Sequence, residues 1–143
     1  MNQTIRRGDI CLVRLYPVVG SEMDGVRPAV VIQNDVGNHF SSTTIVAPFT
    51  TRLRRLTQPT HVLLKNFHEA GMKQESVILA EQVRTIDKSR ICACTGRLPE
   101  EIMEELDMAL SVSLGLDADR RMDMVKMRRE DNVQKTSKES ARA

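Results

Sequence analysis

Two short segments hold the side chains best suited to bind a negatively charged oxygen. The first is Gly20–Pro28, a glycine-flanked loop in which Arg27 stands just before a proline that restricts it to an extended backbone at a strand entrance. The second is Thr43–Arg52, an apolar run that ends in the hydroxyls of Thr50 and Thr51. Guanidinium and hydroxyl groups both donate hydrogen bonds to oxyanions. Either segment alone is more typical of a solvated arginine or of structural threonines, so neither identifies a site by itself.

The cysteines Cys11, Cys92 and Cys94 are a second group with distinctive chemistry. Three cysteines cannot all pair, and three are too few for a disulfide framework. The C-x-C spacing differs from that of zinc-binding cysteine pairs, and no nearby histidine completes a set of four ligands. We therefore expect the cysteines to be small apolar residues in a reducing compartment, with no metal bound.

Short strands are expected to position these groups, because apolar runs of four to six residues rich in Val, Ile and Thr recur between turn-forming segments. Six or seven such runs, with no helices between most of them, predict a small antiparallel barrel or sandwich. One of the expected breaks is Asn34–Ser42. The predicted strands are Ile10–Leu15, Ala29–Gln33, Thr44–Ala47, His61–Leu64, Val77–Ala80, Val83–Ile86 and Arg90–Cys94.

One helix is predicted late in the chain, from Pro99 to about Gly115. Proline suits a first helical position, and the two glutamates that follow it face the positive end of the helix dipole. Residues 117–143 beyond it are polar, and we expect them to extend the helix or to be disordered. The apolar stripe of the helix comprises Ile102, Leu106, Ala109, Leu110 and Leu114.

Composition limits the classes of function. A chain of 143 residues with 41% hydrophobic residues predicts one domain, here residues 1–116, followed by the tail 117–143. Apolar runs fall far short of the roughly 20 residues that span a bilayer, and residues 1–10 lack the apolar stretch of a signal peptide. We therefore expect a cytoplasmic protein without a membrane partner. Residues 1–65 carry 8 basic and 4 acidic side chains, a bias compatible with a polyanion partner.

Taken together, the two segments and their flanks form a specific pattern. The pattern comprises the runs Arg7–Ile10, Pro17–Glu22, Gly25–Asn34, Gly37–Phe40, Thr44–Pro48, Thr50, Ser76–Leu79 and Glu81–Lys88. In order and in spacing these runs resemble the MazF/PemK (Kid) toxins of type II toxin–antitoxin systems, which are sequence-selective endoribonucleases. The resemblance spans about residues 5–116. Met23 departs from it, because the family often has Gln at that position of the loop.

The resemblance implies a mainly β (α+β) fold, an SH3-like small β-barrel with a C-terminal α-helix. It further implies a homodimer that cuts single-stranded mRNA without metal or cofactor and that a cognate antitoxin inhibits. Arg27 and Thr50 match the catalytic pair. The residues expected to contact RNA are Ser21, Glu22 and Gln82, which match positions of the family's RNA groove, together with Phe49, Thr51, Arg52 and Arg54, which lie near the pair in sequence.

The chemistry of such a reaction fits these residues. RNA supplies its own nucleophile, the 2′-hydroxyl, and cleavage leaves a 2′,3′-cyclic phosphate and a 5′-hydroxyl. The Arg27 guanidinium suits the charge on the phosphorane, and the Thr50 hydroxyl can donate to a phosphate oxygen. The sequence leaves the general base open. Arginine is a poor general base near neutral pH, and Glu22 is chemically better suited, but the sequence gives no geometry that shows it within reach. The histidines match no catalytic position of the family: His39, His61 and His68.

Two other functions fit the same fold. One is a toxin that inhibits DNA gyrase by binding it without catalysis, against which the retention of Arg27 and Thr50 argues. The other is an SH3-like adaptor without toxicity. Peptide-binding grooves of that kind depend on aromatic linings, and this chain has only one Tyr, three Phe and no Trp.

Overall fold

The structure of the chain, a computed structural model, describes residues 4–15, 25–52, 58–116 and 130. The tail predicted over 117–143 therefore lies outside the described residues, except for Glu130. Among the described residues the chain forms seven strands, two α helices and two short 3-10 turns. In chain order these are β1 (Asp9–Arg14), β2 (Val26–Val31), α1 (Asp35–Phe40), β3 (Thr43–Thr50), β4 (His61–Leu64), β5 (Ser76–Leu79), η2 (Ala80–Gln82), β6 (Arg84–Asp87), η3 (Lys88–Arg90), β7 (Ile91–Arg97) and α2 (Glu100–Ser113).

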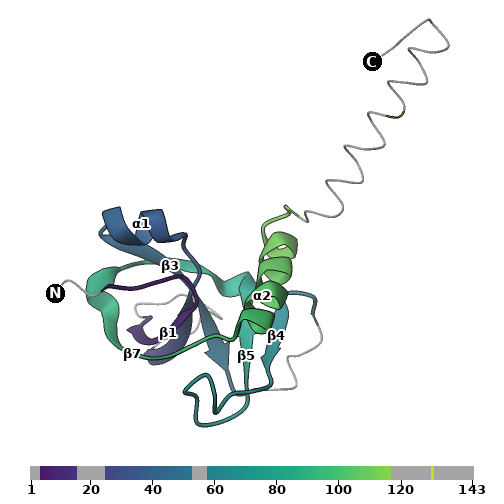
Figure 1. Cartoon of the computed structure of the whole chain (residues 1–143), viewed down its shortest axis with the longest axis horizontal. Helices are drawn as coiled ribbons and strands as arrows, with labels where there is room; N and C mark the ends of the chain where they lie inside the picture. Colours follow the sequence, from purple (N-terminus) through teal and green to yellow (C-terminus); the bar gives the residue numbers. More distant parts are fainter. Residues whose placement is uncertain (1–3, 16–24, 53–57, 117–129, 131–143) are drawn as a thin grey trace, which may run out of the picture.

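The strands form one curved antiparallel sheet built around β3 (Figure 1). Its hydrogen-bonded order is β4-β5-β3-β2-β1-β7, and β6 also pairs with β3. At eight residues β3 is the longest strand, and it pairs with β2, β5 and β6 along different parts of its length. Helix α2 packs against β4 and η2. The prediction of a mainly β, barrel-like fold with a C-terminal helix is confirmed, although this hydrogen-bonded path does not close on itself among the described strands.

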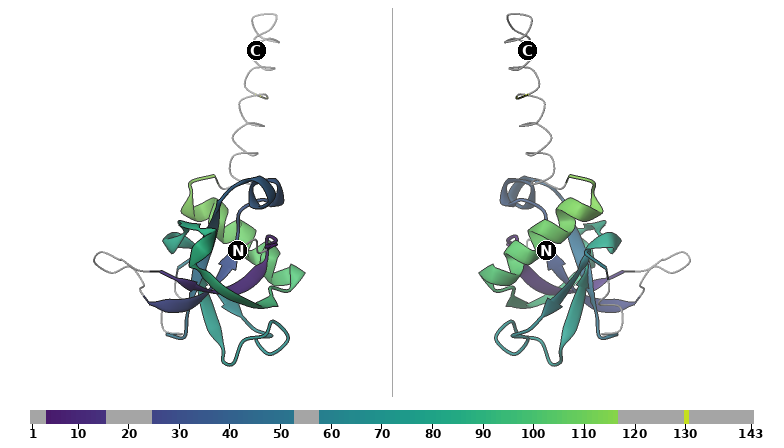
Figure 2. Two further views of the ribbon diagram at one scale, coloured as in Figure 1. Left: turned by 90° about the vertical axis from the view of Figure 1, so that its left-hand side faces the viewer. Right: turned by 90° about the vertical axis from the view of Figure 1, so that its right-hand side faces the viewer.

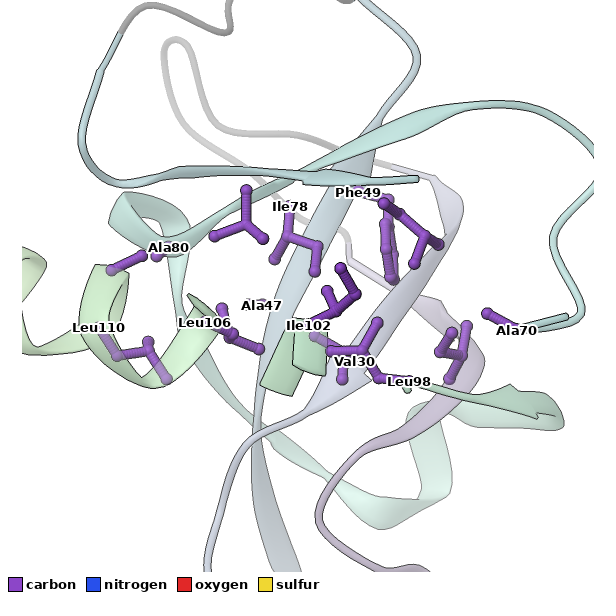
Figure 3. Packing of buried hydrophobic residues seen from close by; sticks show 14 residues of the cluster. Val30, Ala47, Phe49, Ala70, Ile78, Ala80, Leu98, Ile102, Leu106 and Leu110 are labelled. Atoms are coloured by element: carbon purple, nitrogen blue, oxygen red, sulfur yellow. The ribbon is translucent and has the colours of Figure 1, made fainter. Parts of the chain in front are cut away.

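Alternation along the strands builds a core on both faces of the sheet. On β2, Val30 faces a cluster that includes Phe49 and the apolar side of α2, which Figure 3 shows at close range. Its neighbours Ala29 and Val31 face a second cluster on the other side. The predicted stripe of α2 is buried at four positions, whereas Leu114 follows the last helical residue and is exposed, so that part of the prediction is wrong.

Helix α1 lies where the sequence predicts only a break, so that expectation is corrected. Its six residues include a glycine, and its apolar residues Val36 and Phe40 are exposed, so side-chain hydrogen bonds hold it instead of a buried apolar stripe. The N-cap Asn34 accepts from the Gly37 amide at 2.8 Å, and the buried Asn38 accepts from the Thr44 hydroxyl at 2.7 Å. Within the described ranges, neither α helix is long and apolar enough to cross a bilayer.

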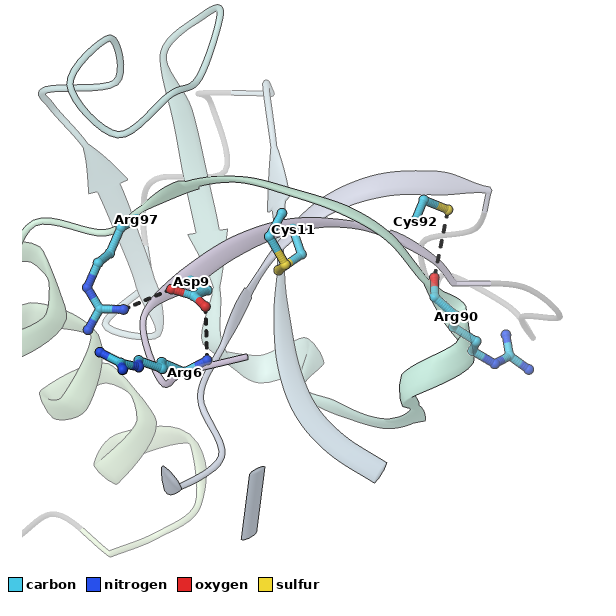
Figure 4. Close-up of a disulfide and its surroundings, with 7 residues drawn as sticks. Arg6, Asp9, Cys11, Arg90, Cys92 and Arg97 are labelled. Carbon is cyan, nitrogen blue, oxygen red and sulfur yellow. Dashed lines mark hydrogen bonds and ion pairs between the residues drawn. A yellow bond between two sulfur atoms is a disulfide. The ribbon is translucent and has the colours of Figure 1, made fainter. Parts of the chain in front are cut away.

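Two of the three cysteines form a disulfide, Cys11–Cys94, contrary to the expectation of reduced thiols (Figure 4). The physical reason is the register of β1 and β7, which places these two residues directly opposite each other. Cys92 lies two residues earlier on β7, with an exposed thiol. Nearby, Arg97 and Asp9 join the same two strands through an ion pair of 2.8 Å. Strand β7 is therefore tied to β1 by covalent, ionic and backbone interactions.

Candidate functional site

The register of β2 and β3 directs Arg27 and Thr50 to the same end of the two strands. The strands are antiparallel, with Ala29 opposite Pro48. Arg27 lies two residues before Ala29 on β2, and Thr50 lies two residues after Pro48 on β3. Because side chains alternate along a strand, both lie on the same face of the sheet as Ala29 and Pro48. Residues 23 positions apart in sequence thus share one face at one end of β2 and β3.

Thr50 is the last residue of β3 and is 8% exposed. Its Oγ1 accepts a hydrogen bond of 3.2 Å from the backbone amide of Arg52, which fixes the hydroxyl at the strand end. Accepting this bond uses a lone pair and leaves the hydroxyl proton for donation to a bound oxygen. Thr51 and Arg52 follow directly, and both are exposed. The structure therefore gathers three of the predicted residues around the end of β3.

Arg27 is exposed on β2, where its strand neighbour is Val13 of β1. Two further arginines reach the same end of β1. Arg84, from β6, donates to the Leu15 carbonyl, and Arg90, from η3, donates to the Arg14 carbonyl at 3.2 Å. The site end of the sheet thus carries more positive charge than the sequence predicts. Arg84 and Arg90 are 57 and 63 residues from Arg27 in sequence, and only strand pairing reveals their proximity.

Gln82 lies in the turn η2, which packs against both β3 and α2. The strands before and after this turn both pair with β3: Ile78 of β5 pairs with Phe49, and Arg84 of β6 pairs with Val46. Turn η2 therefore runs beside the middle of β3, a few residues from Thr50. Gln82 is half-buried and belongs to a different element than Arg27 does.

Next to Gln82, the Glu81 carboxylate joins η2 to the start of β4. Its Oε2 lies 2.9 Å from His61 Nε2, and its Oε1 accepts from the Thr60 hydroxyl at 3.1 Å. Burial raises the pKa of Glu81, but the hydrogen bonds from His61 and Thr60 outweigh this effect, so its pKa lies below the ordinary value of 4.5. Glu81 is thus a fixed anion at neutral pH. Sequence reasoning did not assign it a role.

The other predicted residues have different outcomes. Phe49 is 2% exposed and packs in the core beside Ile78, so the prediction that it contacts RNA is wrong. The reason is strand alternation, which turns Phe49 to the face opposite Thr50. Ser21, Glu22 and Arg54 lie outside the described residues. Within the described ranges, no group of three or more His, Cys, Asp or Glu side chains is arranged to hold a metal ion.

Comparisons with known proteins agree on one family. Residues 6–114 match the family described as the PemK-like, MazF-like toxin of type II toxin–antitoxin systems. The chain is similar to Endoribonuclease EndoA of Bacillus subtilis (strain 168), at 48% identity over 112 residues, which cover 78% of this chain and 96% of that protein.

Solved structures show the same fold. A crystal structure of MazF from Deinococcus radiodurans matches with a TM-score of 0.68 at 25% identity, covering 80% of this chain and 99% of that one. A mycobacterial endoribonuclease in complex with its cognate antitoxin matches with a TM-score of 0.65 at 22% identity, covering 78% of this chain and 96% of that one.

Proposed function

The chain belongs to the PemK-like, MazF-like toxin family of type II toxin–antitoxin systems, and we propose that it cleaves single-stranded mRNA with Arg27 and Thr50 as its catalytic pair. It is a toxin endoribonuclease; the metal independence of the reaction and the roles of these two residues are our proposal. The observation that carries it is the register of β2 and β3, which sets the two side chains on one face of adjacent strands. The alternative of a gyrase-binding toxin has no support in the relatives.

The proposed reaction is attack of a ribose 2′-oxygen on the adjacent phosphorus. The 2′-oxygen forms a bond to phosphorus as the bond to the 5′-oxygen breaks, which yields a 2′,3′-cyclic phosphate and a 5′-hydroxyl. The nucleophile loses one proton, and the leaving oxygen gains one. The guanidinium of Arg27 stabilises the added negative charge through two parallel N–H donors, and the Thr50 hydroxyl donates to a phosphate oxygen. An arginine side chain is a poor general base near neutral pH, so Arg27 suits charge stabilisation and proton donation better than base catalysis.

Several cations around the pair suit an RNA backbone. Arg52 follows Thr50 directly, and Arg84 and Arg90 lie at the end of β1 beside the strand of Arg27. We assign these side chains to phosphate contacts, which makes RNA binding salt-dependent. An acidic segment of the cognate antitoxin would compete for the same charge. A substrate of mRNA places the protein in the cytoplasm.

We further propose that the chain forms a homodimer through an exposed apolar surface on α1 and α2. Arg7 links the two helices, since its amide donates to Asp35 Oδ1 and its guanidinium to Asp107 Oδ1, both at 2.7 Å. Figure 2 shows α1 at the same end of the molecule as the last turn of α2. This α1/α2 surface comprises Val36, Phe40, Met108, Val112, Leu114 and Leu116. Groups of exposed apolar side chains mark interaction sites.

The test is cleavage of a long single-stranded RNA in excess chelator, with mapping of the product ends. We expect the unchanged protein to cut at a short recurring motif and to leave cyclic phosphate and 5′-hydroxyl ends. Thr50→Val should be severely impaired because it lacks the donor, whereas Thr50→Ser should retain activity. Loss of cleavage in chelator would contradict the metal-free reaction, and topoisomerase arrest without RNA scission would favour the gyrase alternative.

A further inference from the structure

His61 occupies a position on β4 that packing alone does not explain. Its side chain is 2% exposed, and its strand partner on β5 is the fully buried Leu79. The ring atom Nδ1 is buried and has no hydrogen-bond partner within the residues that the structure describes. A buried polar atom without a partner is costly, and an aliphatic side chain would fill the same place without that cost. The imidazole must therefore form a stabilising interaction through its other ring nitrogen.

The other nitrogen, Nε2, meets the Glu81 carboxylate at 2.9 Å. Because the pKa of Glu81 is lowered and the group is ionised, Nε2 carries the proton and donates it to Oε2. The Thr60 hydroxyl donates to Oε1 of the same carboxylate at 3.1 Å. Two consecutive residues at the start of β4 thus hold both oxygens of one carboxylate.

These contacts brace a turn that is weak by itself. Turn η2 has three residues, and 3-10 geometry forms poor hydrogen bonds. No side chain caps its first residue. The Thr60 carbonyl accepts from the Ala80 amide at 2.9 Å, so β4 holds the backbone of the turn as well as the Glu81 side chain. Gln82, the next residue of η2, depends on this bracing for its place.

We propose that His61 is a positioning residue for RNA recognition, acting through Glu81 to fix the turn that presents Gln82. The side chain is too deeply buried to touch RNA itself, so its effect must pass through the carboxylate. This inference rests on the proposed function, in which Gln82 contacts RNA. It gives a role to a histidine that the sequence resemblance leaves unassigned.

The test is a double-mutant cycle in the full-length protein. His61→Leu removes the hydrogen bond and keeps an apolar side chain of similar size, and Gln82→Ala removes the proposed contact. Binding is measured by fluorescence anisotropy with an RNA that carries 2′-deoxyribose at the cleaved nucleotide and so cannot be cut. Single-turnover cleavage of the matching ribonucleotide RNA separates binding from the rate at saturation.

We expect each single change to weaken RNA binding about 3- to 10-fold, the range of one lost hydrogen bond. The double variant should bind RNA as tightly as the weaker-binding of the two single variants, or more tightly. The cleavage rate at saturating RNA should stay within about twofold. His61→Gln, whose amide can still donate to Glu81, should restore binding. His68→Leu, a change at an exposed histidine of a loop, should leave binding unchanged.

Glu81→Gln supplies a second variant in case His61→Leu fails to fold, because the carboxylate is 32% exposed and the amide has the same shape. It should show the same non-additivity with Gln82→Ala. Losses that multiply in the double variants, or a fall in thermal stability without a change in binding, would overturn the positioning role. Failure of the unchanged protein to bind or cut RNA would instead overturn the proposed function.

Discussion

Arg27 combines charge with directional hydrogen bonding at the end of β2. The residue is exposed, so its replacement removes little packing. A guanidinium offers two parallel donors to a phosphate, whereas an ammonium is a compact point charge. Activity at this position should therefore depend on the shape of the cation as well as on its sign.

We predict that Arg27→Lys lowers the single-turnover rate of RNA cleavage about 100-fold or more, because it keeps the charge but loses the fork. Arg27→Ala should be at least as impaired. Thermal unfolding by circular dichroism should show both variants within a few degrees of the parent. A lysine variant with full activity would show that a point charge is sufficient and would contradict the proposed role of the fork.

At the scale of single residues, the sequence predicted the chemical groups of the candidate site from residue type. It could not predict positions that depend on contacts with residues far away in the sequence. The separation of Arg27 and Thr50 in sequence does not reveal that they share one end of the sheet; the pairing of Ala29 with Pro48 does. The error at Phe49 was avoidable, because alternation on β3 sends residues 49 and 50 to opposite faces. The hydrogen bond between His61 and Glu81 depends on the contact of β4 with η2, which no local pattern encodes.

Among the elements, α1 depends most on tertiary contacts. The Asp35 carboxylate accepts the Arg7 amide at 2.7 Å and the Asn38 side-chain amide at 3.1 Å. These two bonds hold the pKa of Asp35 below its ordinary value of 3.8. Because the folded pKa is the lower one, ionised Asp35 stabilises the fold at pH values above 3.8, and this contribution is lost as the pH falls through the folded pKa.

We predict that Asp35→Asn lowers the urea midpoint of unfolding at neutral pH, and that its difference from the parent shrinks as the pH falls below the ordinary Asp35 pKa of 3.8. Glu104→Gln, a change on the exposed side of α2, is the matched control and should show a much smaller difference at neutral pH. Circular dichroism across a pH series measures both variants. A difference for Asp35→Asn that is constant with pH would contradict the assigned role of the charge.

A second element-scale feature is the crossing of the loop after β4 over β7. A Cβ added to Gly96 would lie 1.8 Å from the Ala70 carbonyl oxygen, which is backbone and cannot rotate away. We predict that Gly96→Ala destabilises the fold by about 1–3 kcal/mol, the range for overpacked sites. Urea unfolding should show this loss, and Thr95→Ala, at the exposed neighbour, should stay within about 0.5 kcal/mol of the parent. Equal stabilities for the two variants would show that the loop can move.

Sequence patterns predicted the strands well because Val, Ile and Thr alternate in short runs between turn-forming residues. They predicted α2 because its apolar stripe repeats at helical spacing over 14 residues. Helix α1 has only six residues, and its stability comes from partners such as Thr44 and Arg7, which local periodicity cannot reveal. The disulfide was missed for the same reason, since it depends on the register of β1 with β7.

At the scale of the whole molecule, the proposed RNA site and the proposed dimer surface lie on different elements. The end with Arg27 and Thr50 faces RNA in the proposed function, and the α1/α2 surface lies on elements that hold neither residue. Phe40 is 81% exposed, an unusual state for a phenylalanine in an isolated subunit. Pairing of two copies through this surface would cover it and leave Arg27 and Thr50 open to substrate.

We predict that analytical ultracentrifugation finds a species of twice the 16.1 kDa chain mass for the parent. Phe40→Glu combined with Met108→Glu should give a single-chain species, because charges on both helices oppose burial of the surface. His68→Glu, an exposed change away from these helices, should leave the parent's mass unchanged. A parent of single-chain mass at micromolar concentration would contradict the dimer.

The bond between Cys11 and Cys94 makes the polypeptide between them a closed ring. A protease that nicks the ring once, for example between β4 and β5, would release nothing. The two fragments would migrate as one species in electrophoresis until a reductant was added. A chain built this way keeps its pieces together after a single cut for as long as the bond between Cys11 and Cys94 stays oxidised.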